Sequence, residues 1–165
     1  MNFSIRKTVG ILSLVTVIVS VMLAGMSASW AQQQASDEEG VKAASKAFYA
    51  ALAVIDDGAA MDKVWAHTPY VTLVGPRSKS IIVGWDALKN YWADSNKRFS
   101  QRNSVLSDQH IHVNGNLAWE MGQETGELKM KDGTAIKTDW IVTNVYEKIG
   151  GRWLMVSHHV QPKPQ

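Results

Sequence analysis

Apolar residues recur every three or four positions between residues 36 and 56, which is the spacing of one buried helix face. Ser36 stands three residues before Glu39, and such a pair can satisfy the free amide groups at a helix start, so the sequence predicts that a helix begins there. The pattern ends at Asp56-Asp57-Gly58. The apolar face of this predicted helix carries Val41, Ala44, Phe48, Leu52 and Ile55.

Shorter elements are predicted between this helix and residue 99. The spacing of residues 61–65 predicts a second, short helix, which Pro69 closes. Residues 70–74 and 81–83 are rich in β-forming side chains and predict two short strands. Helical spacing then resumes and predicts a third helix, with an apolar face made by Trp85, Leu88, Trp92 and Phe99.

From Val105 onward the pattern changes to that of strands. Three dipeptides suited to tight turns divide this region, namely Asn114-Gly115, Asp132-Gly133 and Gly150-Gly151. Four consecutive strands joined by such turns form an antiparallel meander.

The second strand of the meander, residues 117–130, exceeds the usual strand length of roughly 3 to 10 residues. It contains Gly122 and Gly126, where we expect bulges or bends. A long bent strand predicts a curved sheet that encloses a cavity on its concave side. Its convex side then needs a cover, commonly a second copy of the chain, so a homodimer is expected.

The first 31 residues predict an export signal. Arg6 and Lys7 precede an apolar run from Val9 to Ala24, and small residues follow up to Ala31. We therefore expect cleavage after Ala31 and a periplasmic or secreted mature chain without membrane attachment. The alternative is an uncleaved membrane anchor, because the run approaches the roughly 18 residues that a bilayer span requires.

Composition narrows the remaining possibilities. Removal of 31 of the 165 residues leaves 134, which fits one domain at 37–161, preceded by a polar lead at 32–36 and followed by a tail at 162–165. Two of the 17 basic residues lie in the removed segment, and none of the 15 acidic ones does, so the mature chain has 15 of each. Because this leaves no net positive charge, no nucleic-acid partner is expected. The chain has no cysteine and seven tryptophans, so packing has to provide its stability.

The order of elements, together with two segments, resembles the nuclear transport factor 2-like superfamily, and within it the SnoaL-like group. The segments are Val113-Asn114-Gly115-Asn116-Leu117-Ala118 at the first hairpin and Gly151-Arg152-Trp153-Leu154-Met155-Val156 before two histidines. The closing strands are also similar to the association domain of the calcium/calmodulin-dependent kinase. The resemblance implies an α+β fold in which a cone-shaped curved antiparallel sheet wraps around three N-terminal helices and leaves a central pocket, usually in a dimer.

The resemblance does not imply one reaction, because this fold serves isomerases, cyclases, dehydratases, transport factors and assembly domains. Ketosteroid isomerases of the superfamily use a tyrosine on the first helix, and Tyr49 matches that position. Their aspartate base falls near Val74-Gly75 here, and their late aspartate falls near Thr143. Neither position can perform those roles, so that residue set and its cyclase equivalent are unsupported.

Strand alternation places the other polar candidates, because residues two apart share a face. If Thr143 faces the cavity, as the aligned isomerase position would, Asp139, Ile141 and Val145 face it as well. The same reasoning places on the pocket side of the preceding strand Trp119, Met121, Gln123 and Thr125.

His158 and His159 point to opposite faces of the last strand, and the alignment favours His158 inward. The functional interpretation is that one of them acts as a general base or ligand anchor beside Asp139, with Tyr49 as a proton donor. The alternative is that both are hydrogen-bonded structural residues, one in the core and one in a dimer interface.

Three further groups have two interpretations each. The aromatic side chains of Trp65, Trp92, Trp119 and Tyr49 either line a ligand pocket or simply form the core. His110-x-His112 can chelate a metal only with a third ligand, so no metal site is predicted. A basic group at the end of the third helix is interpreted as solvated rather than as an anion site, and it contains Lys97, Arg98 and Arg102.

The sequence thus predicts an exported domain that binds a small, largely apolar molecule in an aromatic-lined pocket, with proton-transfer chemistry of the isomerase, cyclase or dehydratase kind. The alternative is a ligand-binding or structural dimerisation domain without chemistry. No cofactor is predicted. The chain has neither a phosphate-binding glycine loop nor a serine-elbow motif, so nucleotide hydrolysis and acyl transfer through such a serine are both unsupported.

Overall fold

The computed structural model describes the backbone of residues 5–163 and the side chains of residues 29–163. It divides into two compact units, Met1–Asp37 and Glu38–Gln165. The helix predicted to begin at Ser36 does not begin there, because the helical backbone of α1 (Ile5–Leu52) runs through that position without a break. Ser36 follows glutamine and alanine residues, which favour helix, so the capping pair does not mark a helix end.

The predicted signal segment and its membrane-anchor alternative fall mainly on residues whose side chains lie outside the described part of the chain. Over the described residues, no helix combines the length and apolar character needed to cross a bilayer.

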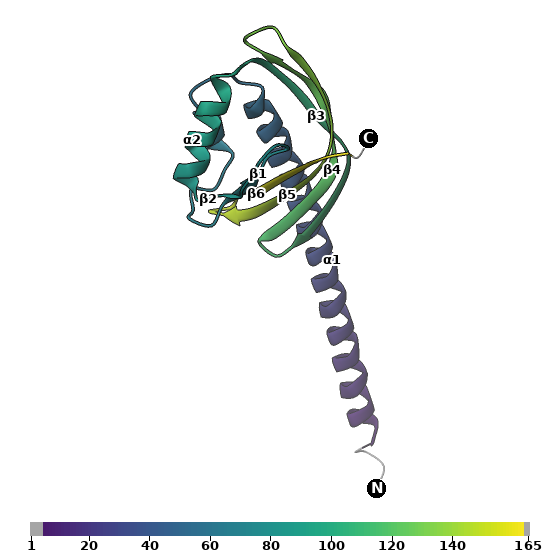
Figure 1. Ribbon diagram of the computed structural model, residues 1–165. Coiled ribbons are helices and arrows are strands. Elements are labelled where there is room, and N and C mark those ends of the chain that lie inside the picture. The colour runs from purple at the N-terminus through teal and green to yellow at the C-terminus, as the bar shows by residue number, and fades with distance from the viewer. Residues whose placement is uncertain (1–4, 164–165) are drawn as a thin grey trace. The chain divides into compact units, whose positions relative to one another are not determined.

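The second unit belongs to the predicted α+β class (Figure 1). Residues 38–52 of α1 open it, and a short 3-10 helix follows at η1 (Met61–Lys63). The later helix is α2 (Trp85–Asn96). The strands are β1 (Thr72–Val74), β2 (Ile82–Val83), β3 (Phe99–Asn114), β4 (Leu117–Met130), β5 (Ala135–Ile149) and β6 (Arg152–Pro162).

The strands form one sheet in the order β2-β1-β6-β5-β4-β3. The antiparallel meander from β3 to β6 is confirmed, while β1 adds to its edge in parallel to β6. In Figure 1 the long strands bow around the C-terminal part of α1, and α2 lies on the same concave side. The sheet stays open, with β2 and β3 as its edge strands.

Helix α2 ends earlier than predicted, and Phe99 opens β3 instead of continuing the helix. Asn96 ends α2, and its side-chain amide donates to the carbonyl oxygens of Val54 and Asp56, at 3.5 and 3.0 Å. This side chain is buried, so it ties the end of α2 to the loop after α1. The chain then turns into β3, which begins six residues before the predicted start at Val105.

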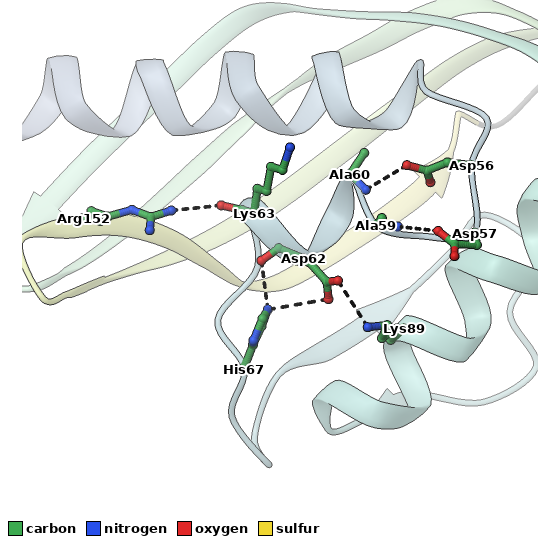
Figure 2. A network of polar contacts seen from close by, with 9 residues as sticks. All are labelled: Asp56, Asp57, Ala59, Ala60, Asp62, Lys63, His67, Lys89 and Arg152. Atoms are coloured by element: carbon green, nitrogen blue, oxygen red, sulfur yellow. Dashed lines mark hydrogen bonds and ion pairs between the residues drawn. The ribbon is translucent and has the colours of Figure 1, made fainter.

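The loop after α1 is held by carboxylates (Figure 2). The Asp56 carboxylate accepts from the amides of Gly58 and Ala60, at 2.8 and 2.9 Å. Asp62 pairs with Lys89 of α2 at 3.2 Å, and Arg152 of β6 donates to the Lys63 carbonyl at 3.1 Å. These contacts fix α2 and the β5–β6 hairpin relative to the loop.

The main irregularity of β3 and β4 lies on β3, and not in β4 where bulges were expected. The pairing shifts between Ser107 and His110, opposite Gly122, and Asp108 there adopts a φ of 51°. An extra residue re-aims the side chains that follow it. Gln109 thereby reaches the buried face of the sheet.

Gly126 serves a different purpose from the expected bulge, because it allows β3 to approach closely. A Cβ atom at this position would stand 1.8 Å from the carbonyl oxygen of Asn103. Only glycine therefore fits the observed approach of β3 to β4.

The core lies between the sheet and the helices, with the Phe48 ring near its centre. Four aromatic rings surround Phe48, those of Tyr49, Trp65, Trp92 and His158, at centroid distances of 5.2, 6.3, 6.2 and 4.9 Å. The predicted apolar face of the first helix is confirmed at Val41, Phe48 and Leu52, all of them buried. Two of these rings, those of Trp92 and His158, also line a cavity beside the core.

Candidate functional site

A cavity of about 370 Å³ lies on the concave side of the sheet. Its apolar lining includes Leu52, Leu73, Trp92, Phe99, Leu128, Trp140 and Val160. Its titratable lining comprises Arg77, Tyr91, Arg98, Arg102, Glu124 and His158. The walls are thus mainly apolar and aromatic, with a few polar groups placed among them.

Glu120 does not line this cavity, and its carboxylate accepts four hydrogen bonds from side chains. It is completely buried on β4. Its carboxylate accepts from Ser45, Asn144 and Tyr146 at 2.8–2.9 Å and from Gln109 at 2.6 Å. The donors from Ser45, Asn144 and Tyr146 share Oε2, and Gln109 bonds Oε1. Glu120 is therefore a structural group that orients its neighbours.

Asn144 transmits that orientation to His158. The Asn144 side-chain nitrogen donates to Glu120, so its oxygen accepts from His158 Nδ1 at 2.7 Å. This bond assigns the proton to Nδ1 and leaves the lone pair on Nε2. His158 is buried and lines the cavity. The bond to Asn144 fixes the orientation of the imidazole ring and therefore the direction of the Nε2 lone pair.

His158 is neutral at physiological pH. Burial, together with the charge of neighbouring His159, lowers the pKa of its imidazole from 6.5 to about 3. The ring is thus a hydrogen-bond acceptor at Nε2 and not a cation.

Glu124 is the second polar group in the cavity. It shares a strand face with Glu120 and is buried, and its carboxyl accepts a hydrogen bond from the Tyr49 hydroxyl at 3.2 Å. Burial raises the pKa of the Glu124 carboxyl, and the hydroxyls of Ser104 and Tyr49 oppose that rise. A carboxyl with a raised pKa is a candidate proton donor.

Tyr49 contacts Glu124 but does not line the cavity. Burial raises the pKa of its phenol strongly, and the carboxyl of Glu124 adds to the rise. The hydroxyl therefore stays protonated and positions Glu124. The predicted role of Tyr49 as a direct donor to a ligand has no support in this geometry.

The predicted orientation of β5 is wrong. Asp139, Ile141 and Thr143 lie on the face opposite to the cavity, because the buried residues of β5 are the even-numbered ones, including Val142 and Asn144. Asp139 forms a surface ion pair with Lys163 at 2.6 Å. It therefore cannot act beside His158.

The same correction applies to β4, where the exposed residues include Trp119 and Met121, at 41% and 45% exposure. Gln123 lies on that face as well and accepts from Lys163 at 2.9 Å. His159 is exposed and pairs with Thr143, whereas His158 faces inward as predicted. None of these outward residues lines the cavity.

An irregularity in β6 explains why His158 shares the inward face with Asn144 rather than with Thr143. Tyr146 pairs with Met155, but Val145 pairs with Ser157, so Val156 is an extra residue. A regular hairpin would pair His158 with Thr143, whereas the shift pairs it with Asn144. A shift of one residue moves every following side chain to the other face.

The aromatic candidates divide between the two interpretations. Trp92 lines the cavity, while Trp65 is buried in the core without lining it. His110 and His112 lie on the exposed face, where His112 packs on Trp119 at 4.3 Å. Across the residues with described side chains, no three His, Cys, Asp or Glu groups gather as metal ligands would.

The interpretation of the basic group as solvated is wrong for Arg102, which is 4% exposed and lines the cavity. Sequence reasoning also missed Glu120, Glu124 and Asn144. Their signal was available, since Glu120 and Glu124 share a strand face, and Asn144 shares one with Tyr146. Both carboxyls interrupt a strand otherwise expected to bury apolar residues, which marks them as candidates.

Comparison with known proteins agrees with the fold. The family model of the SnoaL-like domain matches residues 41–161. No curated protein matches the chain.

Solved structures share the fold. A candidate dehydratase of the nuclear transport factor 2-like family from Streptomyces avermitilis has a TM-score of 0.70 at 22% identity, covering 79% of this chain and 99% of its own. A nuclear transport factor 2-like superfamily protein from Salmonella enterica has a TM-score of 0.68 at 21% identity, covering 82% and 94%. A candidate calcium/calmodulin-dependent protein kinase II association domain from Xanthomonas campestris has a TM-score of 0.66 at 25% identity, covering 76% of this chain and 86% of its own.

Proposed function

We propose, on the premise that this chain belongs to the SnoaL-like domain family, that it binds a small, largely apolar molecule in its cavity and moves a proton on it. The cavity volume of about 370 Å³ lies within the range of roughly 300–1,000 Å³ that is usual for ligand sites. Tryptophan does not fill the cavity, so a ligand has room.

The observation that carries the proposal is the hydrogen-bond chain from Glu120 through Asn144 to His158. It fixes the tautomer and ring angle of a buried histidine that lines the cavity. A solely structural histidine has no need of a free acceptor atom beside an apolar cavity. Preorganisation of this kind is what general base catalysis requires.

The proposed chemistry uses two groups. His158 Nε2 accepts a proton from the ligand, and the Glu124 carboxyl donates one at a second ligand atom. The two transfers together shift a proton along the ligand or help a hydroxyl leave as water, as in isomerisation or dehydration. Because the pKa of His158 is about 3, the ligand itself has to stabilise the imidazolium that forms.

The test starts from the molecule that co-purifies with the full-length chain, identified by mass spectrometry. Deuterium uptake from D₂O into that molecule is then compared for the wild type, His158→Gln and Glu124→Gln. His159→Gln is the matched control, because His159 is exposed on the other face. Uptake that persists unchanged in His158→Gln would refute the proposed base.

A second candidate function is assembly, and the outer face of the sheet favours it. Apolar side chains gather there on adjacent strands, and Leu117, Trp119, Met121 and Ile141 are 39–45% exposed. An apolar surface of this kind commonly marks a protein interface. We propose that two copies meet through this face, which also suits a ligand-binding or structural domain without chemistry.

Light scattering on the eluting protein tests the assembly. Met121→Lys places a charge in the centre of the proposed interface and should yield a monomer, while Lys129→Met, at the end of the same strand, should leave the dimer intact. A monomeric wild type at high concentration would contradict the homodimer.

Export to the periplasm or outside the cell, with cleavage after Ala31, is likewise proposed. The basic, apolar and small-residue regions in order support it. Mass spectrometry of the chain recovered from the periplasm should give a protein that begins at Gln32. A chain that keeps its first residues and stays with the membrane fraction would favour the anchor instead.

A further inference from the structure

Arg102 is a buried arginine without a carboxylate partner. It extends from β3 into the cavity lining and is 4% exposed. Its guanidinium donates to the Ser95 hydroxyl at 2.7 Å and to the Asn96 side-chain oxygen. Over the residues with described side chains, no Asp or Glu oxygen lies within 4 Å of it.

An uncompensated buried charge is costly, and proteins usually pair it. Burial lowers the pKa of Arg102 to about 10, so the group remains charged at neutral pH. The cavity offers one carboxyl, Glu124, and burial raises the pKa of that group toward its neutral form. Two more arginines, Arg77 and Arg98, line the same cavity and are exposed to solvent. The cavity therefore carries a surplus of positive charge.

The donors of Arg102 are only partly used. A guanidinium has five N–H groups, and the bonds to Ser95 and Asn96 occupy two of them. The ring of Phe99 covers the guanidinium carbon at 4.5 Å, which holds the group in place. The remaining donors can serve a planar two-oxygen acceptor.

We propose that Arg102 forms an anion subsite in this cavity, and that the ligand is a small carboxylic acid with an apolar or aromatic body. The carboxylate pairs with Arg102, while Trp92, Phe99 and Leu128 contact the apolar part. A single buried guanidinium matches a single negative charge, which favours a carboxylate over a phosphate dianion. This inference rests on the proposed ligand-binding function of the cavity.

A structural role alone does not account for the charge. Arg102 does connect β3 to Ser95 and Asn96 at the end of α2. A neutral donor such as glutamine can make similar bonds without the desolvation cost of a buried cation. Charge at this position therefore points to a negatively charged partner.

The test uses benzoate and its neutral isostere benzamide, with binding to the full-length chain followed by tryptophan fluorescence and by NMR. We expect benzoate to bind at least tenfold more tightly than benzamide. Arg102→Gln should remove this preference, and Arg102→Lys should keep part of it. Arg152→Gln is the matched control, because Arg152 is exposed and bonds only the Lys63 carbonyl at the surface.

The outcomes separate this inference from the proposed function. Equal binding of the two probes to the wild type, or an unchanged preference in Arg102→Gln, would overturn the anion subsite while leaving the ligand cavity in place. Binding of neither probe would overturn the anion subsite and count against the cavity as a ligand site. If Arg102→Gln does not fold, the comparison of the two probes on the wild type and on Arg102→Lys decides the question.

Discussion

Glu120 and Glu124 lie on the same strand, on the same face and four residues apart, yet their surroundings differ. Glu120 accepts from four side chains, three of them on Oε2 and one on Oε1. Glu124 accepts from the Tyr49 hydroxyl and lines an open cavity. The number of partners, rather than burial, separates a structural carboxylate from one available to a ligand.

The same contrast extends to the residues around each carboxyl. Around Glu120, polar groups from α1, β3 and β5 converge and exclude solvent. Around Glu124, the cavity is lined by Arg102 and Phe99 of β3 and by Trp92 of α2. His158 connects the two regions, because it bonds Asn144 of the Glu120 cluster and lines the same cavity as Glu124.

The largest effect is expected when Glu120 is removed. Glu120→Ala leaves four donors without their partner, so the free energy of unfolding should fall by about 4 kcal/mol. Urea denaturation followed by circular dichroism measures this. Glu127→Ala on the same strand, an exposed pair with Lys129 at 3.7 Å, should cost less than about 0.5 kcal/mol. Similar losses in the two variants would contradict the closed polar cluster.

His158 should make stability depend on pH. The unfolded chain binds a proton near pH 6.5, whereas the folded one does so near pH 3, so stability is lost as the pH falls through this window. Between pH 7 and 4 the wild type should lose about 3 kcal/mol relative to His158→Gln. Denaturation curves at several pH values test this, with His159→Gln expected to follow the wild type. Parallel pH curves for wild type and His158→Gln would show that the histidine titrates normally.

Gly126→Ala should disturb the cavity end without reaching the Glu120 cluster. The added Cβ would collide with the Asn103 carbonyl, and because β3 is an edge strand it can shift outward, at a cost of about 2 kcal/mol. Amide exchange should rise along β3 near Asn103 and stay unchanged at Gln109. Unchanged exchange at both places would mean that β3 does not approach β4 as closely as described.

The smallest effect on stability is expected for Glu124→Gln. This substitution keeps the shape of a group that is already driven toward its neutral form, so the change at neutral pH should stay below about 1 kcal/mol. As the pH rises above the ordinary pKa of a glutamate, the wild type should lose stability relative to the variant, because the folded carboxyl has a raised pKa and ionises at a cost. A large loss at neutral pH would show that Glu124 is structural, as Glu120 is.

Local signals predicted the order of elements well. The turn at Gly150-Gly151 is confirmed, with both residues at positive φ, 57° and 79°. The strand at residues 117–130 is confirmed with its bounds. Such features depend on neighbours in the sequence, so a single chain suffices to identify them.

Which side chains of each strand point toward the core could not be predicted in the same way. On β4 the buried face carries Glu120, Gly122 and Glu124, while Trp119 and Met121 point outward. This reverses the usual rule that the apolar set of a strand is buried. The buried carboxyls are tolerated only because donors from distant elements meet them, and no local pattern reports such donors.

The sequence by itself determined the kinds of elements and their order, because turn chemistry and hydrophobic period act locally. Only the tertiary structure decided which face holds the site. The extra residue Val156 shifts His158 from Thr143 to Asn144, and that choice depends on how two strands pair over their whole length. The burial of Arg102 was decided in the same way, since α2 and β3 cover it only after they pack together.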